Sequence, residues 1–220
     1  MRVLIIGASG GIGAAVAQNL RAEGADIVTL SRRDDGFDVT DPVRIEALLG
    51  AIEGPFDLIF TAIGLLAPPG GAPEKSLGAI KAAAMADVFA VNTIGPALIL
   101  RHAARLMPKD RRAVVATLSA RVGSIGDNKI GGWHSYRASK AALNQIVHGA
   151  AIELGRSHKQ SICVALHPGT VATLFTENYA ERHKTIPAPE AAANLLRVIQ
   201  NLSPDQTGGF FDYAGQGIVW

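Results

Sequence analysis

A tyrosine and a lysine in the second half of the chain have the spacing of a proton-transfer pair. Tyr136 and Lys140 are four residues apart, so a helix would place both side chains on one face. A phenol has a pKa of about 10, and a neighbouring ammonium favours the phenolate and brings that pKa toward the working range. Taken alone, the pair is also typical of an amphipathic surface helix, so its interpretation depends on the rest of the chain.

A short segment rich in glycine follows the first apolar run. Gly7-Ala8-Ser9-Gly10-Gly11-Ile12-Gly13 lies between a predicted strand, Val3–Ile6, and a predicted helix, Ile12–Ala22. Glycines at such a turn let the backbone approach a ligand closely, and the helix N-terminus offers unpaired N–H groups to a pyrophosphate. The spacing is G-x-x-x-G-x-G rather than G-x-G-x-x-G, and a tight turn without a ligand is the alternative interpretation.

The residues after the second predicted strand bear on the choice of dinucleotide. The usual fingerprint has a carboxylate here that binds a ribose 2′-hydroxyl, whereas this chain has Ser31-Arg32-Arg33 after Asp26–Leu30. A guanidinium attracts a 2′-phosphate and can bind it through two parallel hydrogen bonds. The sequence therefore predicts NADP(H) in preference to NAD(H). The alternative for Arg32 and Arg33 is a solvated surface pair.

These motifs need a scaffold, and strand patterns alternate with helical patterns along the whole chain. Such alternation builds βαβ units, and therefore a parallel sheet with helices on both faces. We predict one doubly wound α/β domain of the Rossmann type over residues 1–220. The predicted strands are Val3–Ile6, Asp26–Leu30, Asp57–Thr61, Ala113–Leu118, Ile162–His167 and Gly209–Asp212. The predicted helices are Ile12–Ala22, Pro42–Ile52, two within Leu77–Met107, Tyr136–Leu154 and Pro189–Gln200.

Composition argues against several classes of protein. The 220 residues carry 21 Lys and Arg against 19 Asp and Glu without a run of five like charges, so the charge pattern predicts no nucleic-acid partner. The single cysteine, Cys163, excludes an internal disulfide framework. The apolar run before Gly7 is too short for a signal peptide, and Val88–Leu100 is too short to span a bilayer. We expect a cytoplasmic protein with no membrane partner.

The histidines have no metal-ligand spacing, so we expect no metal site. We interpret them, His167 included, as surface or packing residues. His134 is the exception, because it lies two residues before Tyr136 and is a candidate for the substrate cleft. Trp133 is a second candidate for that cleft, with core packing or a subunit contact as its alternative. The loop Leu65–Gly71 follows a predicted strand and should lie at the edge of the sheet where ligands bind.

Several motifs occur together and in one order. The glycine turn, Asn92-Thr93-Ile94-Gly95, Tyr136–Lys140 and Pro168-Gly169 resemble, in order and intervals, those of the short-chain dehydrogenase/reductase family. The resemblance covers the whole chain. Ser119–Ile125 and Gly131-Gly132-Trp133 make the chain most similar to the small reductases grouped with C-factor and the sniffer-type carbonyl reductases.

The resemblance also implies roles for single residues. Tyr136 matches the general acid–base, Lys140 the residue that lowers its pKa and binds the ribose, and Asn92 the residue that holds a proton-relay water. Asp38 matches the acid that contacts the adenine. Together with Arg32, which its charge suggests, the expected cofactor contacts are Gly7, Ser9, Gly11, Ile12, Gly13, Asp38, Val39, Gly64, Asn92, Tyr136, Lys140, Pro168, Gly169, Val171 and Thr173.

The family's catalytic serine is harder to place. Aligning Gly123 puts Ala120 at the position of that serine, with Ser119 one residue earlier. Ser119, Ser124 or neither supplies the hydroxyl, which would donate a hydrogen bond to the carbonyl oxygen as charge develops on it. The alternative for either serine is a hydroxyl bonded to the backbone.

We expect hydride transfer between NADP(H) and a small carbonyl or alcohol substrate. Two alternatives stay open. One is an NAD(P)-binding sensor or signalling protein with little turnover, suggested by Ala120 and by Thr61-Ala62 in place of two family asparagines. The other is a reductase of a pterin-type imine. The substrate loop is expected at about residues 174–187, and the resemblance implies a homodimer or homotetramer formed through the long helices.

Overall fold

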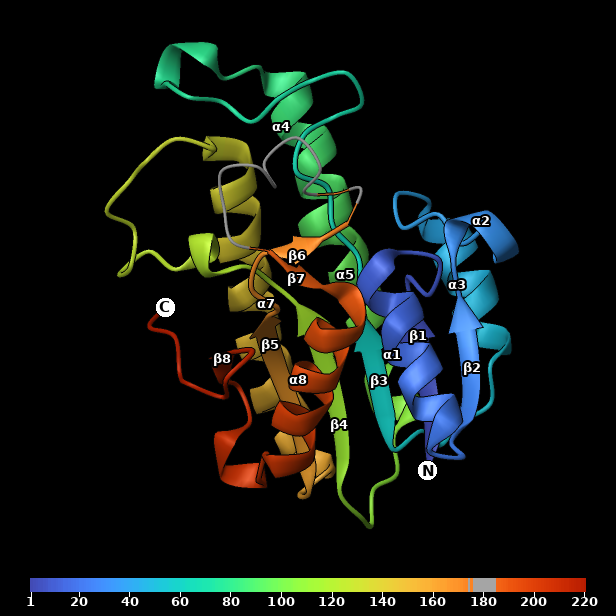
Figure 1. The fold of residues 1–220 in the computed structure, drawn as a ribbon. Helices are drawn as coiled ribbons and strands as arrows, with labels where there is room; N and C mark the ends of the chain where they lie inside the picture. The colour runs from blue at the N-terminus through green and yellow to red at the C-terminus, as the bar shows by residue number, and fades with distance from the viewer. Residues whose placement is uncertain (174, 176–184) are drawn as a thin grey trace.

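The computed structural model describes residues 1–173, 175 and 185–220. Its centre is a six-stranded sheet in the order β2-β1-β3-β4-β5-β8, in which every neighbouring pair is parallel (Figure 1). A short parallel pair, β6 and β7, forms a second small sheet. The strands are β1 (Arg2–Ile6), β2 (Asp26–Leu30), β3 (Leu58–Thr61), β4 (Ala113–Leu118), β5 (Ser161–His167), β6 (Val171–Ala172), β7 (Ile186–Pro187) and β8 (Phe210–Asp212).

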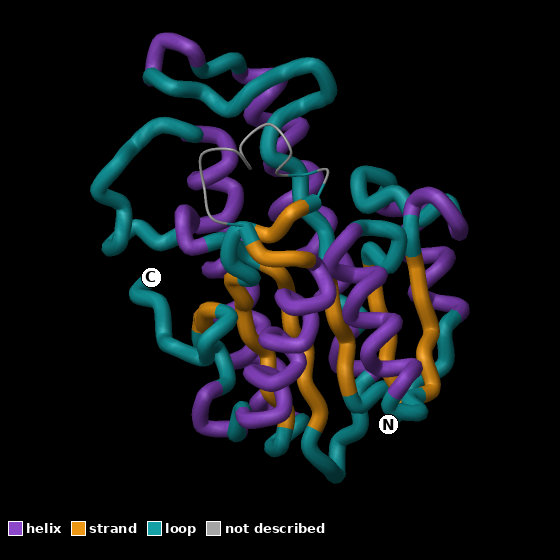
Figure 2. Tube along the Cα trace, in the orientation of Figure 1, coloured by secondary structure: helices purple, strands orange, loops and turns teal. Residues whose placement is uncertain are grey.

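Helices cover both faces of the sheet (Figures 1 and 2). On one face, α1 (Gly11–Ala22) and α8 (Ala188–Asn201) share an apolar core with the central strands. On the other, α3 (Pro42–Ala51), α5 (Gly95–Leu100) and α7 (His134–Ser157) contribute to a second core. The remaining described α-helices are α2 (Arg32–Asp35), α4 (Ala82–Phe89) and α6 (Ala103–Leu106). The prediction of one doubly wound α/β domain is confirmed.

The central strands have no polar face. Every residue of β3 and β4 is buried, and so is all of β5 except its last residue. Strands covered by helices on both sides are continuous apolar runs rather than alternating ones, and this made them recognisable in the sequence. Outside residues 77–107, the predicted strands and helices occur with ends that differ by up to three residues.

The segment predicted as two helices within Leu77–Met107 is divided more finely. A 3₁₀ turn at Leu77–Ala79 precedes α4, and five residues of π-helix, Ala90–Ile94, join α4 to α5. Apolar residues surround this π turn in the sequence, so periodicity could not reveal it. The turn buries the polar residues Asn92 and Thr93. Such turns are frequent at functional sites.

The same region bears on the membrane expectation. Ala82–Leu100 is long and apolar enough to cross a membrane by length and composition, so the apolar helical stretch exceeds the Val88–Leu100 run considered from the sequence. Length and composition do not separate a membrane span from a core helix. Within this stretch, the Thr93 hydroxyl donates to the Ser139 carbonyl of α7 at 2.8 Å. The stretch therefore packs on the helix that carries Tyr136.

The predicted substrate loop, residues 174–187, falls largely outside the described residues, which leave out 174 and 176–184. Its last two residues form β7, which pairs with β6.

The glycine turn between β1 and α1 has a shape that side chains would block. Gly7 has a φ of +92°, and a Cβ on it would collide with the Ala62 carbonyl after β3. A Cβ on Gly13 would collide with the carbonyl oxygen of Gly7. The start of α1 therefore packs directly on the turn, which keeps the first N–H groups of the helix at the carboxyl edge of the sheet.

We expect Gly13→Ala to lower the free energy of unfolding by about 1–3 kcal/mol, because overpacking here displaces backbone rather than a flexible side chain. Gly50→Ala is the matched control. Gly50 lies in α3 with open space around its Cβ position, so alanine there should leave stability unchanged or raise it by up to about 1 kcal/mol. Urea unfolding of both variants measures the difference, and equal stabilities would contradict the close approach of α1 to the turn.

Candidate active site

A cavity of about 1040 Å³ lies at the carboxyl edge of the sheet. In open α/β sheets this edge is where ligands bind. Most of the residues singled out from the sequence line it: Ser9, Gly11, Ile12, Gly13, Arg32, Gly64, Ser119, Tyr136, Lys140, Pro168, Gly169, Val171 and Thr173. Gly7, Asp38, Val39, Asn92 and Ser124 are not among the lining residues.

The N-terminus of α1 faces this cavity. Its N-cap, Gly10, provides no side-chain hydrogen bond, and its first turn contains no acidic residue. Ser9, Gly10 and Gly11 all lie in the cavity wall. The positive end of the helix dipole and the first N–H groups are therefore oriented to bind a phosphate.

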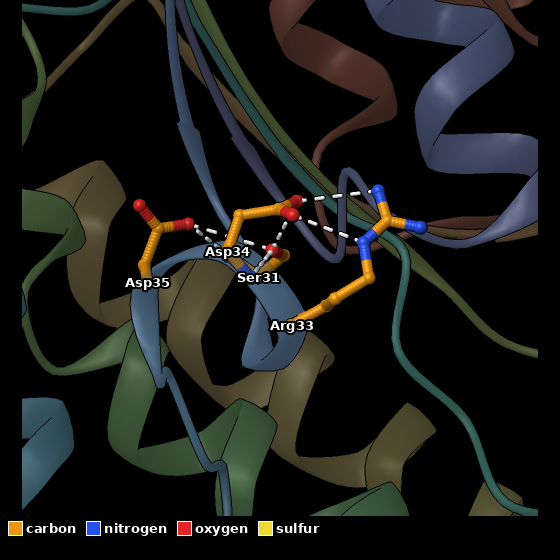
Figure 3. Close-up of polar contacts among 4 residues, drawn as sticks. All are labelled: Ser31, Arg33, Asp34 and Asp35. Atoms are coloured by element: carbon orange, nitrogen blue, oxygen red, sulfur yellow. Dashed lines mark hydrogen bonds and ion pairs between the residues drawn. The ribbon is translucent and has the colours of Figure 1, made fainter.

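Arg32 and Arg33, which the sequence does not distinguish, have different contacts in the structure. Figure 3 shows those of Arg33. Ser31 caps the short helix α2: its Oγ accepts from the Asp34 N–H at 3.0 Å, and its N–H donates to Asp35 Oδ2 at 2.8 Å. Arg33 pairs with Asp34, with 2.9 Å between Nε and Oδ1. Arg32 instead lines the cavity. Of the two, Arg32 is the one placed to meet a ligand.

The adenine contacts implied by the resemblance are not in this cavity wall. The Asp38 carboxylate accepts from the Thr40 N–H at 2.8 Å and from its hydroxyl at 2.7 Å, and these bonds lower the pKa of Asp38. Val39 packs against the position of Gly95 at the start of α5. Both residues therefore have contacts within the protein that would shape the loop after β2.

Tyr136 and Lys140 lie at the start of α7 and both line the cavity, although their exposed fractions are only 6% and 2%. The Lys140 ammonium donates from Nζ to the Leu118 carbonyl at the end of β4, at 3.0 Å. Burial raises the pKa of Tyr136 and lowers the pKa of Lys140 to about 7. The sequence analysis expected Lys140 to lower the tyrosine pKa. In the structure, loss of hydration is the larger effect on both residues.

The structure distinguishes the two candidate serines. Ser119 lines the cavity, but its Oγ donates to Asn144 Oδ1 on α7 at 2.6 Å. Ser124 lies away from the cavity, with its hydroxyl bonded to the Val219 carbonyl and to the Asp127 N–H. The C-terminal segment holds Ser124 there, so its position does not support it as the catalytic hydroxyl. Ala120 does line the cavity.

Asn92 is fully buried behind the cavity wall. Its Oδ1 accepts from the Leu65 N–H at 2.7 Å, and its Nδ2 donates to the Leu65 carbonyl at 2.7 Å and to Ser139 Oγ at 3.0 Å. Three of the four hydrogen-bonding positions of this amide are thus used by the protein. The side chain fixes the loop after β3 to α7, and a relay water would depend mainly on other atoms of this residue.

Glu74, which the sequence analysis did not single out, holds the start of α7. Its carboxylate accepts from the Ser135 N–H at 3.2 Å and from the Ser135 hydroxyl. The Trp133 N–H donates to the Glu74 carbonyl, and the Trp133 ring meets the Tyr136 ring edge-on with centroids 6.3 Å apart. Glu74 is 61 residues from Ser135 in the sequence, so no local pattern could reveal this contact.

The sequence analysis named none of the other described lining residues as a cofactor contact or catalytic residue, and they are Gly10, Ala62, Ile63, Pro69, Leu118, Ala120, His167, Ala172 and Phe175. Pro69 belongs to Leu65–Gly71, the loop that the sequence placed at this edge. His167 was interpreted as a surface or packing residue. Its position at the end of a predicted strand, directly before Pro168-Gly169, was the available signal. His134 is not a lining residue, and among the described residues no group of His, Cys, Asp and Glu could hold a metal ion.

Known proteins are similar to this chain in sequence and in fold. A family model described as enoyl-(acyl carrier protein) reductase matches residues 7–208. The chain is 30% identical to 1-hydroxy-2-glutathionyl-2-methyl-3-butene dehydrogenase of a Rhodococcus species, over 99% of each chain. It is 37% identical to C-signal of Myxococcus xanthus, over 66% of this chain and 84% of that one.

A solved structure extends the comparison to the fold. The NADPH-bound carbonyl reductase from chicken fatty liver is 25% identical and superposes with a TM-score of 0.79, over all of this chain and 98% of that one. The family match covers the glycine turn, the tyrosine–lysine pair and the segment after β5. The chain therefore belongs to the short-chain dehydrogenase/reductase family of oxidoreductases, whose members act on carbonyl and alcohol groups.

Proposed function

We propose that this protein transfers hydride between NADP(H) and a small carbonyl or alcohol substrate, with Tyr136 as the general acid–base. The observation that carries the proposal is the shared cavity. Tyr136 and Lys140 line the same cavity as the uncapped start of α1 and Arg32. One ligand with a pyrophosphate in its middle and a reacting ring at its end would touch all of these groups.

The residues present fit a nicotinamide dinucleotide phosphate. The turn at Gly7 and Gly13 has no room for side chains, and the first residues of α1 line the cavity without a side-chain cap. Lys140 has two ammonium hydrogens beyond the one given to Leu118, enough to bind ribose hydroxyls. When bound, NADP(H) supplies or accepts hydride at the nicotinamide ring.

Tyr136 supplies the proton. During reduction the phenol gives its proton to the carbonyl oxygen while hydride adds to the carbonyl carbon, so that C=O becomes CH–OH. Burial raises the pKa of Tyr136, which keeps the phenol protonated at neutral pH and favours this direction. When it is protonated, Lys140 favours the phenolate that is left behind, because both side chains lie in one buried wall. Alcohol oxidation reverses both transfers.

The preference for NADP(H) follows from charge. Arg32 lines the cavity, while the acidic residues that follow it point back to α2, where Asp34 bonds to Ser31 and Arg33, and Asp35 bonds to Ser31. A 2′-phosphate would therefore meet a guanidinium rather than a carboxylate. The NADPH bound to the chicken carbonyl reductase supports the same choice.

A sensor or signalling role is the second candidate. The hydroxyls of Ser119 and Ser124 are bonded within the protein, and Ala120 lines the cavity where the family has serine. A site without that hydroxyl would bind the dinucleotide well and turn over slowly. The similarity to C-signal is compatible with this role. Reduction of any member of a panel of substituted benzaldehydes, aliphatic ketones and quinones would favour the enzyme.

For Tyr136→Phe we expect carbonyl reduction to fall by about 10²–10⁴-fold, because the general acid is lost. NADPH affinity, measured by fluorescence titration, should change by less than about threefold. Ser124→Ala is the control, since it removes a hydroxyl that lies outside the cavity, and it should keep near wild-type turnover. Near wild-type turnover by Tyr136→Phe would overturn the proposed role.

Arg32→Ala should weaken NADPH binding by about 10–100-fold, the usual contribution of a charge-assisted hydrogen bond, and leave NADH binding unchanged. Arg33→Ala removes the same charge from a side chain that pairs with Asp34, and it should change NADPH affinity by less than about threefold. Calorimetric titration of both cofactors measures the four affinities. Equal losses in the two variants would mean that only net charge matters.

Lys140 should give the protein a pH-dependent stability. Burial lowers its pKa from 10.5 to about 7 in the folded state, so above about pH 7 the unfolded chain binds one more proton than the folded chain. The free energy of unfolding therefore rises with pH in this range. We expect the wild type to gain about 2 kcal/mol relative to Lys140→Met between pH 7 and pH 9. Urea unfolding without cofactor tests this, and parallel pH curves would refute it.

A further inference from the structure

The proposed reduction needs a hydrogen-bond donor for the carbonyl oxygen besides Tyr136, and neither of the two candidate serines provides one. Ser119 Oγ donates to Asn144, and Ser124 lies away from the cavity. The wall position of the family's serine is Ala120, which has no donor on its side chain. The following inference rests on the proposed function and concerns the residue that fills this role.

His167 lies beside the missing hydroxyl. It is the last residue of β5, and β5 pairs with β4 so that Leu166 is opposite Leu118. The Ser119 N–H continues this pairing by donating to the Leu166 carbonyl at 2.8 Å. His167 comes directly after Leu166 on β5, and Ser119 and Ala120 come directly after Leu118 on the neighbouring strand β4. All three residues line the same cavity.

The charged groups near His167 leave its imidazole neutral. Burial, helped by the Arg121 cation, lowers the pKa of His167 to about 4, and Asp212 opposes this shift only in part. Asp212 is itself paired with Arg121 at 3.0 Å. The Tyr213 ring lies edge-on to the imidazole with centroids 6.5 Å apart. The other titratable side chains among the described lining residues of the cavity are Arg32, Tyr136 and Lys140.

One ring nitrogen of His167 has no partner. Nδ1 is buried without a hydrogen bond among the described residues, whereas the residue as a whole is partly exposed and lines the cavity. A buried N–H without an acceptor is rarer and less favourable than a buried lone pair without a donor. The single proton of the neutral ring therefore belongs on Nε2, the ring nitrogen that is not buried without a partner.

We propose that His167 donates a hydrogen bond from Nε2 to the carbonyl oxygen of the substrate, in the role that a serine hydroxyl at position 120 would have. Hydride adds to the carbonyl carbon and Tyr136 gives its proton to the oxygen, while His167 keeps its own proton throughout. A neutral imidazole serves here as a fixed dipole that stabilises developing negative charge. The arrangement selects substrates that bring a carbonyl oxygen within reach of both Tyr136 and His167.

Three variants test this role. His167→Phe keeps a planar ring and removes the N–H, so kcat on the panel carbonyl that the wild type reduces fastest should fall by about 10²-fold. NADPH affinity and Tm should stay near wild type. His167→Gln offers an amide N–H in place of Nε2 and should recover most of the loss. The double variant His167→Phe with Ala120→Ser should also recover activity, because serine restores a donor to the same wall.

The controls separate this inference from the proposed function. His148→Phe removes an imidazole that bonds the Gly208 carbonyl away from the main cavity, and it should leave kcat unchanged. If the wild type reduces no carbonyl in the panel, the proposed function fails. If the wild type is active, but His167→Phe stays within about twofold of it or neither Gln nor Ala120→Ser recovers the loss, the role of His167 is overturned.

Nitrogen NMR gives a readout that does not depend on turnover. In ¹⁵N-histidine-labelled wild type, His167 should be neutral with its proton on Nε2 from pH 5.5 to 8. A resonance assigned to the Nδ1–H tautomer, or a titration near pH 6.5, would contradict the proposal whatever the activity of the variants. The His167→Phe spectrum assigns the signal.

Discussion

Burial of the Lys140 ammonium against the end of β4 is the interaction that constrains the rest of the site. The described structure gives this charge a backbone carbonyl at 3.0 Å and no carboxylate, so its position depends on how firmly α7 is held. Contacts to α7 are correspondingly dense around Ser139, whose hydroxyl accepts from Asn92 and whose carbonyl accepts from Thr93. A buried charge with few partners is costly, and rigid surroundings prevent it from escaping to water.

Two polar side chains that the family resemblance made candidates for catalysis form hydrogen bonds within the protein instead. Ser119 ties β4 to α7 through Asn144, and Asn92 ties the loop after β3 to the same helix. Glu74 closes the set by bonding the first turn of α7. Each contact joins the active-site helix to a different segment, so the orientation of the helix is fixed by elements that come before it in the chain.

The fold was largely predictable from the sequence, and the site was predictable only where its residues belong to local patterns. Continuous apolar strands and the spacing of Tyr136 and Lys140 are local signals. The hydroxyl bond of Ser119, the Glu74 contact and the π turn around Asn92 depend on segments distant in sequence or on apolar surroundings without a clear period. The direction of the Tyr136 pKa shift was missed for the same reason, because burial is a property of the assembled fold.

The order of the sheet also has a consequence for synthesis of the chain. β2, β1 and β3 all lie within the first 61 residues and can pair as soon as they emerge from the ribosome. β3 borders β4, which begins only at Ala113, so the backbone N–H and C=O groups on that edge of β3 stay unpaired while about fifty further residues are made. Such an edge is a template for pairing with other chains. The half that carries the glycine turn and Arg32 is thus made first, and it is most exposed to aggregation before the half that carries Tyr136 and Lys140 exists.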